Sequence, residues 1–322
     1  MRKTLAIIAT MLPVLILAQQ LTSSSNIIIT KTWSQEPSGY TYPISVSVPS
    51  GAVPQGGFPV CILLHGNGGN GGGMVPAFSS TLSCHVLVAP SGYLNSWNIS
   101  DESSEAPDVE MIEELIDTLQ TFTNINPNKI RLLGTSNGAA LSNRVLIENK
   151  NSGIDIICAI VSQLSEAQYH NNNFYYPSGA TGGTDPYDGY DSITTPITGR
   201  KYLSICNNND QLIPYGGGPS VGVNFLNAQL ATYIVAQSQG YTGTQITGPG
   251  TAIGTAGAIV YEYSYLSGQV VHIRGNAGHT TNSTQLSYVT SFFNDCNNIV
   301  GLTRNNAEKL NLYPNPTQSL IK

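Results

Sequence analysis

Ser136 stands between two glycines in the segment Gly134-Thr135-Ser136-Asn137-Gly138, which has the pattern G-x-S-x-G. An apolar run at 129–133 precedes this segment, and a helix-like stretch at 139–149 follows it. A turn between strand and helix exposes a serine hydroxyl, and its glycines let the two elements approach closely. The pattern therefore predicts a nucleophilic serine. A Gly/Ser-rich turn without chemistry is the alternative.

A serine hydroxyl needs a base and an acid to become a nucleophile. Of the five histidines, His279 is the best base, because it lies in a small-residue loop between a strand and the last helix. Asp210 ends a short apolar strand and is the predicted acid that orients the imidazole. The alternatives are an Asx turn at Asp210 and the use of a nearby carboxylate, namely Asp185, Asp188 or Asp191.

A second loop supplies the predicted oxyanion donors. The apolar stretch 61–64 runs into His65-Gly66-Asn67-Gly68-Gly69. We expect one donor at the backbone N–H of Asn137 and the other at a backbone N–H of Gly66 or Asn67. A phosphate-binding loop is disfavoured, because the glycines do not open a G-x-G-x-x-G helix and no Gly-Lys-Ser/Thr follows.

Taken together, these motifs resemble the secreted esterase family that includes polyhydroxybutyrate depolymerases, feruloyl esterases and acetyl-xylan esterases. The resemblance covers about residues 59–296 and implies an α/β-hydrolase fold. The matching segment after Asp210 contains Tyr215, and two smaller matches lie around Trp97 and at 108–112; the resemblance implies substrate contacts by Trp97 and Tyr215. The family usually has Gly-Thr where this chain has Asn207-Asn208, and an aromatic-proline pair where it has Thr281-Asn282. Both departures concern substrate preference.

Composition narrows the function classes. The chain has 322 residues, a net charge of −6 and only 10% charged residues, which argues against nucleic acid and an anionic membrane surface as partners. No C-x-x-C or H-x-x-x-H spacing indicates zinc, and the chemistry needs no cofactor. We expect a monomer with one catalytic domain at 19–296.

Strands and helices alternate along this domain, which predicts a largely parallel sheet with the chemistry at the carboxyl ends of its strands. An opening β-hairpin or a pair of edge strands is expected at 26–33 and 42–48. Further strands are expected at 60–64, 86–89, 130–133, 154–161, 202–206, 258–265 and 270–274, and helices at 107–122, 139–149, 223–237 and 283–294.

The stretch 165–200 breaks this alternation, because it is polar, Gly-rich and aromatic. It is interpreted as an irregular lid whose Tyr175, Tyr176 and Tyr187 stack on a sugar or an aromatic acyl group. A surface loop whose tyrosines pack on one another is an equal alternative. The acidic run 185–191 could bind calcium, but a polar turn is favoured because its spacing is not that of an EF-hand.

Both ends of the chain predict export. Residues 1–18 have the charged start and apolar run of a signal peptide, with an uncleaved anchor as the alternative. Residues 297–309 are predicted to be a linker. Residues 310–322 resemble the opening of a truncated C-terminal sorting domain of the type IX secretion route in Bacteroidota, which would make the secretion machinery a partner. An exported protein can form disulfides, and Cys61 with Cys84 is the favoured pair.

The resulting hypothesis is a secreted serine carboxylesterase. The family resemblance points to feruloyl or acetyl esters of plant-wall polysaccharide, or to polyester of the polyhydroxybutyrate or aromatic kind. A serine peptidase of the same fold would use the same three side chains. A non-catalytic polymer- or sugar-binding protein would normally lose one of them, and none is lost here.

Overall fold

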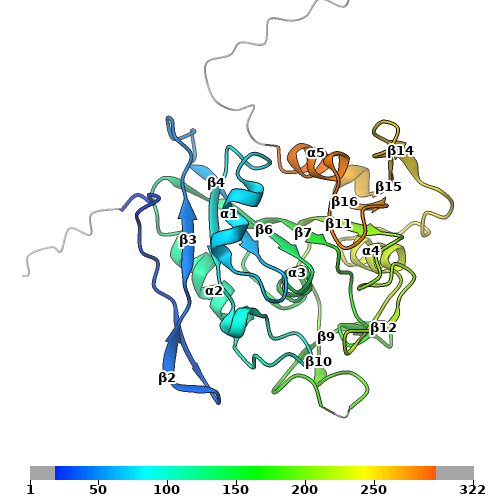
Figure 1. Cartoon of the computed structure of the whole chain (residues 1–322), viewed down its shortest axis with the longest axis horizontal. Coiled ribbons are helices and arrows are strands. Elements are labelled where there is room, and N and C mark those ends of the chain that lie inside the picture. Colours follow the sequence, from blue (N-terminus) through cyan, green and yellow to red (C-terminus); the bar gives the residue numbers. More distant parts are fainter. Residues whose placement is uncertain (1–18, 184, 295–322) are drawn as a thin grey trace, which may run out of the picture.

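A nine-stranded sheet runs through the computed structural model, which describes residues 19–183 and 185–294. The strand order is β14-β15-β16-β11-β7-β6-β4-β5-β3 (Figure 1). The six adjacent strands β16, β11, β7, β6, β4 and β5 are parallel to one another. At the two edges, β3 is antiparallel to β5, β15 is antiparallel to β16, and β14 is antiparallel to β15. The predicted signal peptide, linker and sorting segment lie outside the described residues.

The strands of this sheet are β3 (Ile44–Ser47), β4 (Phe58–Leu64), β5 (Val86–Pro90), β6 (Ile125–Thr135), β7 (Ile154–Ile160), β11 (Lys201–Asn207), β14 (Thr251–Ile253), β15 (Val260–Tyr265) and β16 (Val270–Gly275). The helices are α1 (Gly71–Phe78), α2 (Asp108–Leu119), α3 (Asn137–Glu148), α4 (Ala228–Ser238) and α5 (Ser283–Phe292). Smaller antiparallel sheets pair β1 (Thr30–Trp33) with β2 (Glu36–Thr41), β12 (Gly218–Ser220) with β13 (Val223–Phe225), and β8 (Tyr169–His170) with β9 (Asn173–Pro177) and β10 (Tyr190–Thr194).

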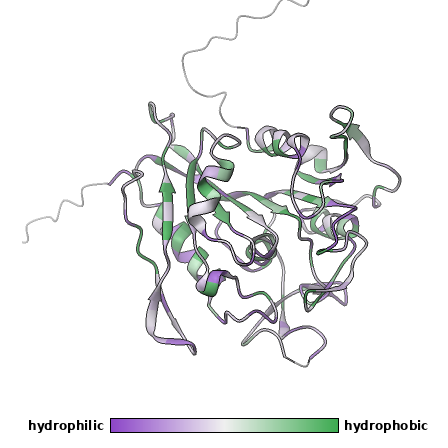
Figure 2. Ribbon diagram, viewed as in Figure 1, coloured by the Kyte–Doolittle hydropathy of each residue, from purple (hydrophilic) through white to green (hydrophobic). Residues whose placement is uncertain are grey.

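Helices cover both faces of the sheet, as the predicted α/β-hydrolase fold requires. One core cluster contains residues of α2, α3 and α4, and the other contains residues of α1 and α5. Strands β4 and β5 are apolar along their whole length, and β7 is apolar except at Asp155, because both faces of the sheet are covered (Figure 2). The fold class predicted from the sequence is confirmed.

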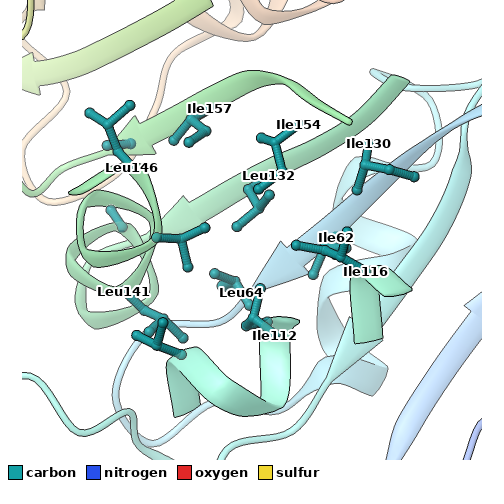
Figure 3. Packing of buried hydrophobic residues seen from close by; sticks show 14 of the residues in the cluster. Ile62, Leu64, Ile112, Ile116, Ile130, Leu132, Leu141, Leu146, Ile154 and Ile157 are labelled. Atoms are coloured by element: carbon teal, nitrogen blue, oxygen red, sulfur yellow. The ribbon is translucent and has the colours of Figure 1, made fainter. Parts of the chain in front are cut away.

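The core beneath the candidate site is made of branched aliphatic side chains that interdigitate between α2, α3 and the sheet (Figure 3). Burial of each such side chain contributes about 1.5–3 kcal/mol. The labelled members are Ile62, Leu64, Ile112, Ile116, Ile130, Leu132, Leu141, Leu146, Ile154 and Ile157. This packing fixes α3, and with it the start of α3, relative to the strand ends.

Two elements differ from the sequence-based expectation. Helix α1 was not predicted, because Gly71, Gly72 and Gly73 are poor helix formers. It starts nevertheless, since the Asn70 side chain accepts a hydrogen bond from the Gly73 N–H. Residues 223–225, predicted to begin a helix, form β13 instead, and the helix starts only after Asn227.

The stretch 165–200 is not irregular, because it contains the small sheet β8-β9-β10. His170 is stacked between the rings of Tyr175 and Tyr187, with centroid distances of 3.7 and 3.6 Å. Asp185 accepts hydrogen bonds from two backbone N–H groups of its own turn. The stretch therefore packs on itself, which is the alternative interpretation of a surface loop whose tyrosines pack within it.

The predicted pairing of Cys61 with Cys84 is wrong. Cys84 is disulfide-bonded, whereas Cys61, Cys158 and Cys206 carry free buried thiols. The parallel register sets Cys61 beside Leu87, and Cys84 lies three residues earlier in the chain. Cys84 lies in the turn before β5 and is therefore not a cross-strand neighbour of Cys61.

In the described stretches, 19–183 and 185–294, no helix is long and apolar enough to span a bilayer.

Strand β6, helix α3 and the end of β4 meet at two glycines. A Cβ on Gly134 would lie 2.0 Å from the carbonyl oxygen of Gly138. A Cβ on Gly138 would lie 2.3 Å from the carbonyl oxygen of Leu64 and 2.5 Å from that of His65. Only glycine permits this approach, which brings the loop after β4 against the start of α3.

Gly134→Ala should therefore destabilise the fold, because the new methyl group meets backbone that cannot rotate away. Overpacking of this kind costs about 1–3 kcal/mol or more, which corresponds to about 2–4 °C in Tm per kcal/mol. Thermal unfolding followed by circular dichroism measures the effect. Gly179→Ala is the control, because nothing lies within 4 Å of its added Cβ. Equal melting temperatures for the two variants would contradict the explanation.

Candidate active site

Ser136 occupies the sharp turn between β6 and α3. Its backbone has φ 54° and ψ −120°, in a region that L-residues rarely adopt. Such a conformation costs about 1–3 kcal/mol and persists only where the surroundings hold it. The Ser136 N–H donates to the Ile160 carbonyl at 2.9 Å, which ties the turn to the end of β7. The predicted nucleophile elbow is thus present as geometry.

The structure brings the three predicted catalytic side chains into one hydrogen-bonded row. Ser136 Oγ donates to His279 Nε2 at 2.8 Å, and His279 Nδ1 donates to Asp210 Oδ2 at 2.8 Å. The other carboxylate oxygen, Oδ1, accepts from the N–H groups of Leu212 and Ile213. Asp210 is buried, whereas the His279 side chain is 25% exposed. The acceptor-only carboxylate fixes the tautomer that leaves Nε2 free to take a proton.

The loop that carries His279 is held by a buried amide that the sequence analysis treated only as a departure from the family pattern. Asn207 Nδ2 donates to the carbonyl oxygens of Gly278 and Thr280, both at 2.7 Å. Its Oδ1 accepts from Gln285 Nε2 at 2.8 Å. Asn207 and Gln285 are fully buried. Asn207 therefore fixes the loop on both sides of the histidine, and its place at the end of β11 was the available signal.

Asn137 stands at the first position of α3, directly after the serine. The first N–H groups of a helix lack intrahelical partners and carry partial positive charge. The Asn137 side chain accepts from Trp97 N–H at 2.8 Å and donates to Glu102 Oε1 at 2.8 Å. Burial raises the pKa of Glu102, against the backbone N–H groups of Ser100 and Ile99 that lower it. The predicted donor is therefore anchored through its own side chain.

The second donor loop is positioned by His65. Its Nδ1 donates to the Gly66 carbonyl at 2.8 Å, and its Nε2 accepts from the Gly92 N–H at 2.9 Å. Burial lowers the pKa of His65, which keeps the ring neutral for these two roles. The Gly66 carbonyl also accepts from Gly69 N–H. In a trans peptide the Asn67 N–H points away from that carbonyl, which favours Asn67 over Gly66 as the oxyanion donor.

The structure does not bring the predicted substrate-binding aromatic residues to the serine. Trp97 is fully buried, and its indole N–H donates to the His65 carbonyl at 2.8 Å. Tyr175 and Tyr187 enclose His170, and Tyr176 lies in a separate polar depression beside α2. Trp97, Tyr175 and Tyr187 are therefore used for packing, whereas Tyr176 is 36% exposed and does not line the cavity beside Ser136.

Tyr215 is also used internally. Its hydroxyl donates to Nε2 of His272 at 3.0 Å, while His272 Nδ1 donates to Ser204 Oγ at 3.1 Å. Burial, with a smaller contribution from the Arg274 guanidinium, lowers the pKa of His272 to about 3. His272 is therefore a neutral core side chain, in agreement with its interpretation as part of a strand.

A cavity of about 480 Å³ opens beside Ser136. Its walls come from the turn before α2, the start of α3, the segment after β7, and the segments around β12 and β13. The lining residues are Asn67, Leu94, Ser96, Ile99, Asp101, Glu102, Ser103, Ser136, Asn137, Ala140, Ser162, Gln163, Ser165, Gln168, Leu212, Ile213, Val221, Val223 and Phe225. Among the exposed lining residues, Leu94, Leu212 and Val221 (56, 43 and 58% exposed) present apolar surface beside the polar Asn67, Asp101 and Ser103.

No protein-family model matches this chain, and no curated protein matches its sequence. Solved structures with a similar fold include a carboxylesterase from Bacillus cereus, 13% identical, with 78% of this chain and 93% of that chain covered and a TM-score of 0.49. A carboxylesterase from Mesorhizobium loti is 14% identical, with 78% of this chain and 93% of that chain covered and a TM-score of 0.45. A poly(3-hydroxybutyrate) depolymerase from Bordetella parapertussis is 14% identical, with 62% of this chain and 72% of that chain covered and a TM-score of 0.42. Likeness at this level concerns the fold alone.

Asn207→Ala should lower turnover of any substrate that uses His279, because the histidine loop loses two hydrogen bonds. Misplacement of a reacting group by about 1 Å can cost about 100-fold in rate, so we expect kcat to fall about 10- to 100-fold with little change in KM. Steady-state kinetics on a soluble ester measures this. Asn208→Ala, at the exposed neighbouring position, is the control. A kcat within twofold of the parent would contradict the positioning role of Asn207.

His272→Gln should change how stability depends on pH. The pKa of His272 is about 3 in the folded protein and 6.5 as the ordinary value, so folding favours the neutral ring. Its contribution is present above pH 6.5 and is lost at about 1.4 kcal/mol per pH unit as the pH falls. Urea unfolding at pH 7, 6 and 5 should show the difference between parent and variant shrinking below pH 6.5.

Asp108 has the opposite effect on how the folding stability depends on pH, because burial raises the pKa of its carboxyl to about 7. It is present in both proteins, so its effect cancels in the difference between them. A difference in unfolding free energy that stays constant from pH 7 to pH 5 would contradict the assignment of His272 as a buried neutral ring.

Proposed function

We propose that this protein is a serine hydrolase of carboxylic esters. The observation that carries the proposal is the hydrogen-bonded row Ser136–His279–Asp210, with Ser136 at the N-terminus of α3. A hydroxyl, a neutral imidazole and an orienting carboxylate in this order are what acyl transfer through a serine requires. Asn137 and Asn67, whose backbone N–H groups are the proposed oxyanion donors, both line the same cavity.

The reaction follows from these positions. Ser136 Oγ attacks the ester carbonyl carbon while His279 Nε2 takes its proton. The carbonyl oxygen becomes an oxyanion and is stabilised by the N–H groups of Asn137 and Asn67. As the tetrahedral intermediate collapses, His279 gives the proton to the leaving alkoxide, so that the alcohol departs and an acyl-enzyme remains. Water, deprotonated by His279, then releases the acid and restores Ser136.

Asp210 orients His279 throughout this cycle. Its two backbone donors and the imidazole satisfy the carboxylate in a buried place. The negative charge stabilises the imidazolium that forms when His279 takes the serine proton. Asp185, one of the alternative carboxylates, accepts hydrogen bonds from its own turn instead.

The cavity favours a neutral, largely aliphatic acyl group. Among the described residues that line it, none is Lys or Arg, whereas Asp101 and Glu102 are acidic. Anionic substrates would therefore be repelled. Phe225 is the single aromatic ring of this lining, which gives little support to stacking of a feruloyl ring. Of the two substrate classes inferred from the family resemblance, aliphatic polyester is favoured over feruloyl esters of plant-wall polysaccharide.

Export is part of the proposal. It is supported by the charged start and apolar run of residues 1–18 and by the sorting-like segment 310–322. An ester hydrolase with apolar side chains exposed at its cavity suits polymers that are too large to enter the cell.

Ser136→Ala should abolish hydrolysis of p-nitrophenyl butyrate, with a loss of about a thousandfold to a millionfold in kcat, while the protein still folds. A fluorophosphonate probe, which reacts only with an activated serine, should label the parent at Ser136 and leave the variant unlabelled. Ser291→Ala, on the exposed side of α5, is the control and should behave as the parent.

Turnover within tenfold of the parent in Ser136→Ala would overturn the assignment. Cleavage of a p-nitroanilide peptide faster than of the ester would favour a peptidase instead. Absence of both turnover and labelling in the parent would favour a non-catalytic binding protein.

A further inference from the structure

Ser162 is a second serine on the wall of the catalytic cavity. It lies two residues after Ile160, whose carbonyl accepts the Ser136 N–H. The side chain of Ser162 is 2% exposed, and its hydroxyl makes no hydrogen bond to any residue in the described part of the chain. Its Oγ is not one of the completely buried side-chain atoms that lack a hydrogen-bond partner, so it keeps some accessible surface. The hydroxyl is therefore reached from the cavity and is unsatisfied there.

The backbone before Ser162 is strained. Val161 has φ 51°, which is a conformational outlier for a β-branched residue. Its N–H donates to the Ile205 carbonyl at 2.7 Å, which holds the residue in place at the end of β7. Strain of this kind persists mainly at functional sites. Here it ends the strand abruptly and places Ser162 on the cavity wall.

The other polar groups on this wall already have partners. Gln163 Nε2 donates to the carbonyls of Pro214 and Leu226. Ser165 Oγ and the Gln168 side chain bind each other's backbone N–H groups. The lining also includes the apolar side chains of Ile213, Val223 and Phe225. Ser162 thus carries a buried hydroxyl without a protein partner on this wall, and such a group gains from a ligand that binds it.

The cavity is on the acyl side of the proposed reaction. His279 must lie beside the leaving alcohol, because its Nε2 protonates that oxygen. His279 is not among the described residues that line the cavity. In the proposed reaction we therefore assign the acyl group to the cavity and the alcohol to the side of His279.

We infer that Ser162 is a specificity residue whose hydroxyl binds an oxygen of the acyl group. The inference rests on the proposed ester hydrolysis and deepens it: the substrates are esters whose acyl part carries a hydroxyl or carbonyl oxygen besides the scissile ester. A site built to hydrogen-bond an oxygen discriminates against the analogue that lacks it, because its own polar group is then left unpaired.

The test compares acyl groups with one leaving group. Ethyl butyrate, ethyl 2-hydroxybutyrate, ethyl 3-hydroxybutyrate and ethyl 3-oxobutyrate are hydrolysed in a pH-stat by the parent and by Ser162→Ala. We expect the substitution to lower kcat/KM about three- to tenfold for at least one oxygen-bearing ester. For ethyl butyrate it should change kcat/KM less than twofold.

Two further variants keep the test sharp. Ser162→Cys keeps the volume with a weaker donor and should lose the same selectivity, which covers the case in which Ser162→Ala folds poorly. Ser165→Ala removes a neighbouring hydroxyl that is already paired, so it should leave the ratios between the four esters unchanged.

The outcomes separate the two proposals. Equal changes on all four esters in both Ser162 variants, with the parent active, would overturn the role of Ser162 and leave ester hydrolysis standing. Loss of selectivity in Ser165→Ala as well would also overturn it, because the effect would then belong to the wall in general. A parent that hydrolyses none of the esters and whose Ser136→Ala variant is no different would overturn the proposed function itself.

Discussion

The close approach of β6, α3 and the end of β4 is the constraint on which the whole site depends. At Gly134 and Gly138 the backbones are so near that any side chain would collide with a carbonyl oxygen. This contact forces Ser136 into its strained turn and presses the loop after β4 against the start of α3. The nucleophile and both proposed oxyanion donors are therefore positioned by one crossing, which the apolar core behind it holds together.

Hydrogen bonds from neutral amide side chains, more than ion pairs, hold the parts of the site in their relative positions. Asn207 and Gln285 fix the histidine loop, and the Asn137 side chain ties the start of α3 to the turn before α2. An amide both donates and accepts, so one buried side chain can satisfy several backbone groups without the cost of burying a charge. This arrangement fits a chain in which only 10% of residues are charged. A scaffold of this kind is also little affected by salt.

Substrate selection falls to segments that differ from the one the composition suggested. The tyrosine-rich stretch 165–200 folds into its own small sheet and encloses His170. Of the described residues in this stretch, only Ser165 and Gln168 line the cavity, which is bordered mainly by the turn after Asp210, the β12–β13 hairpin, the segment before α2 and the segment after β7. In the proposed reaction the apolar lining binds the aliphatic part of the acyl group, and the buried Ser162 hydroxyl binds one oxygen of it.

The sequence by itself determined the elements that depend on local pattern. The alternation of strands and helices, the elbow around Ser136, and Asp210 and His279 after later strands could all be predicted, because period, glycine and strand ends are local signals. The failed predictions depended on register or on side-chain partners. Cys61 lies beside Leu87 because of the β4–β5 register, and Tyr215 is held by His272. Only the tertiary structure decided these pairings, since partners far apart in sequence are chosen by packing, which no local pattern records.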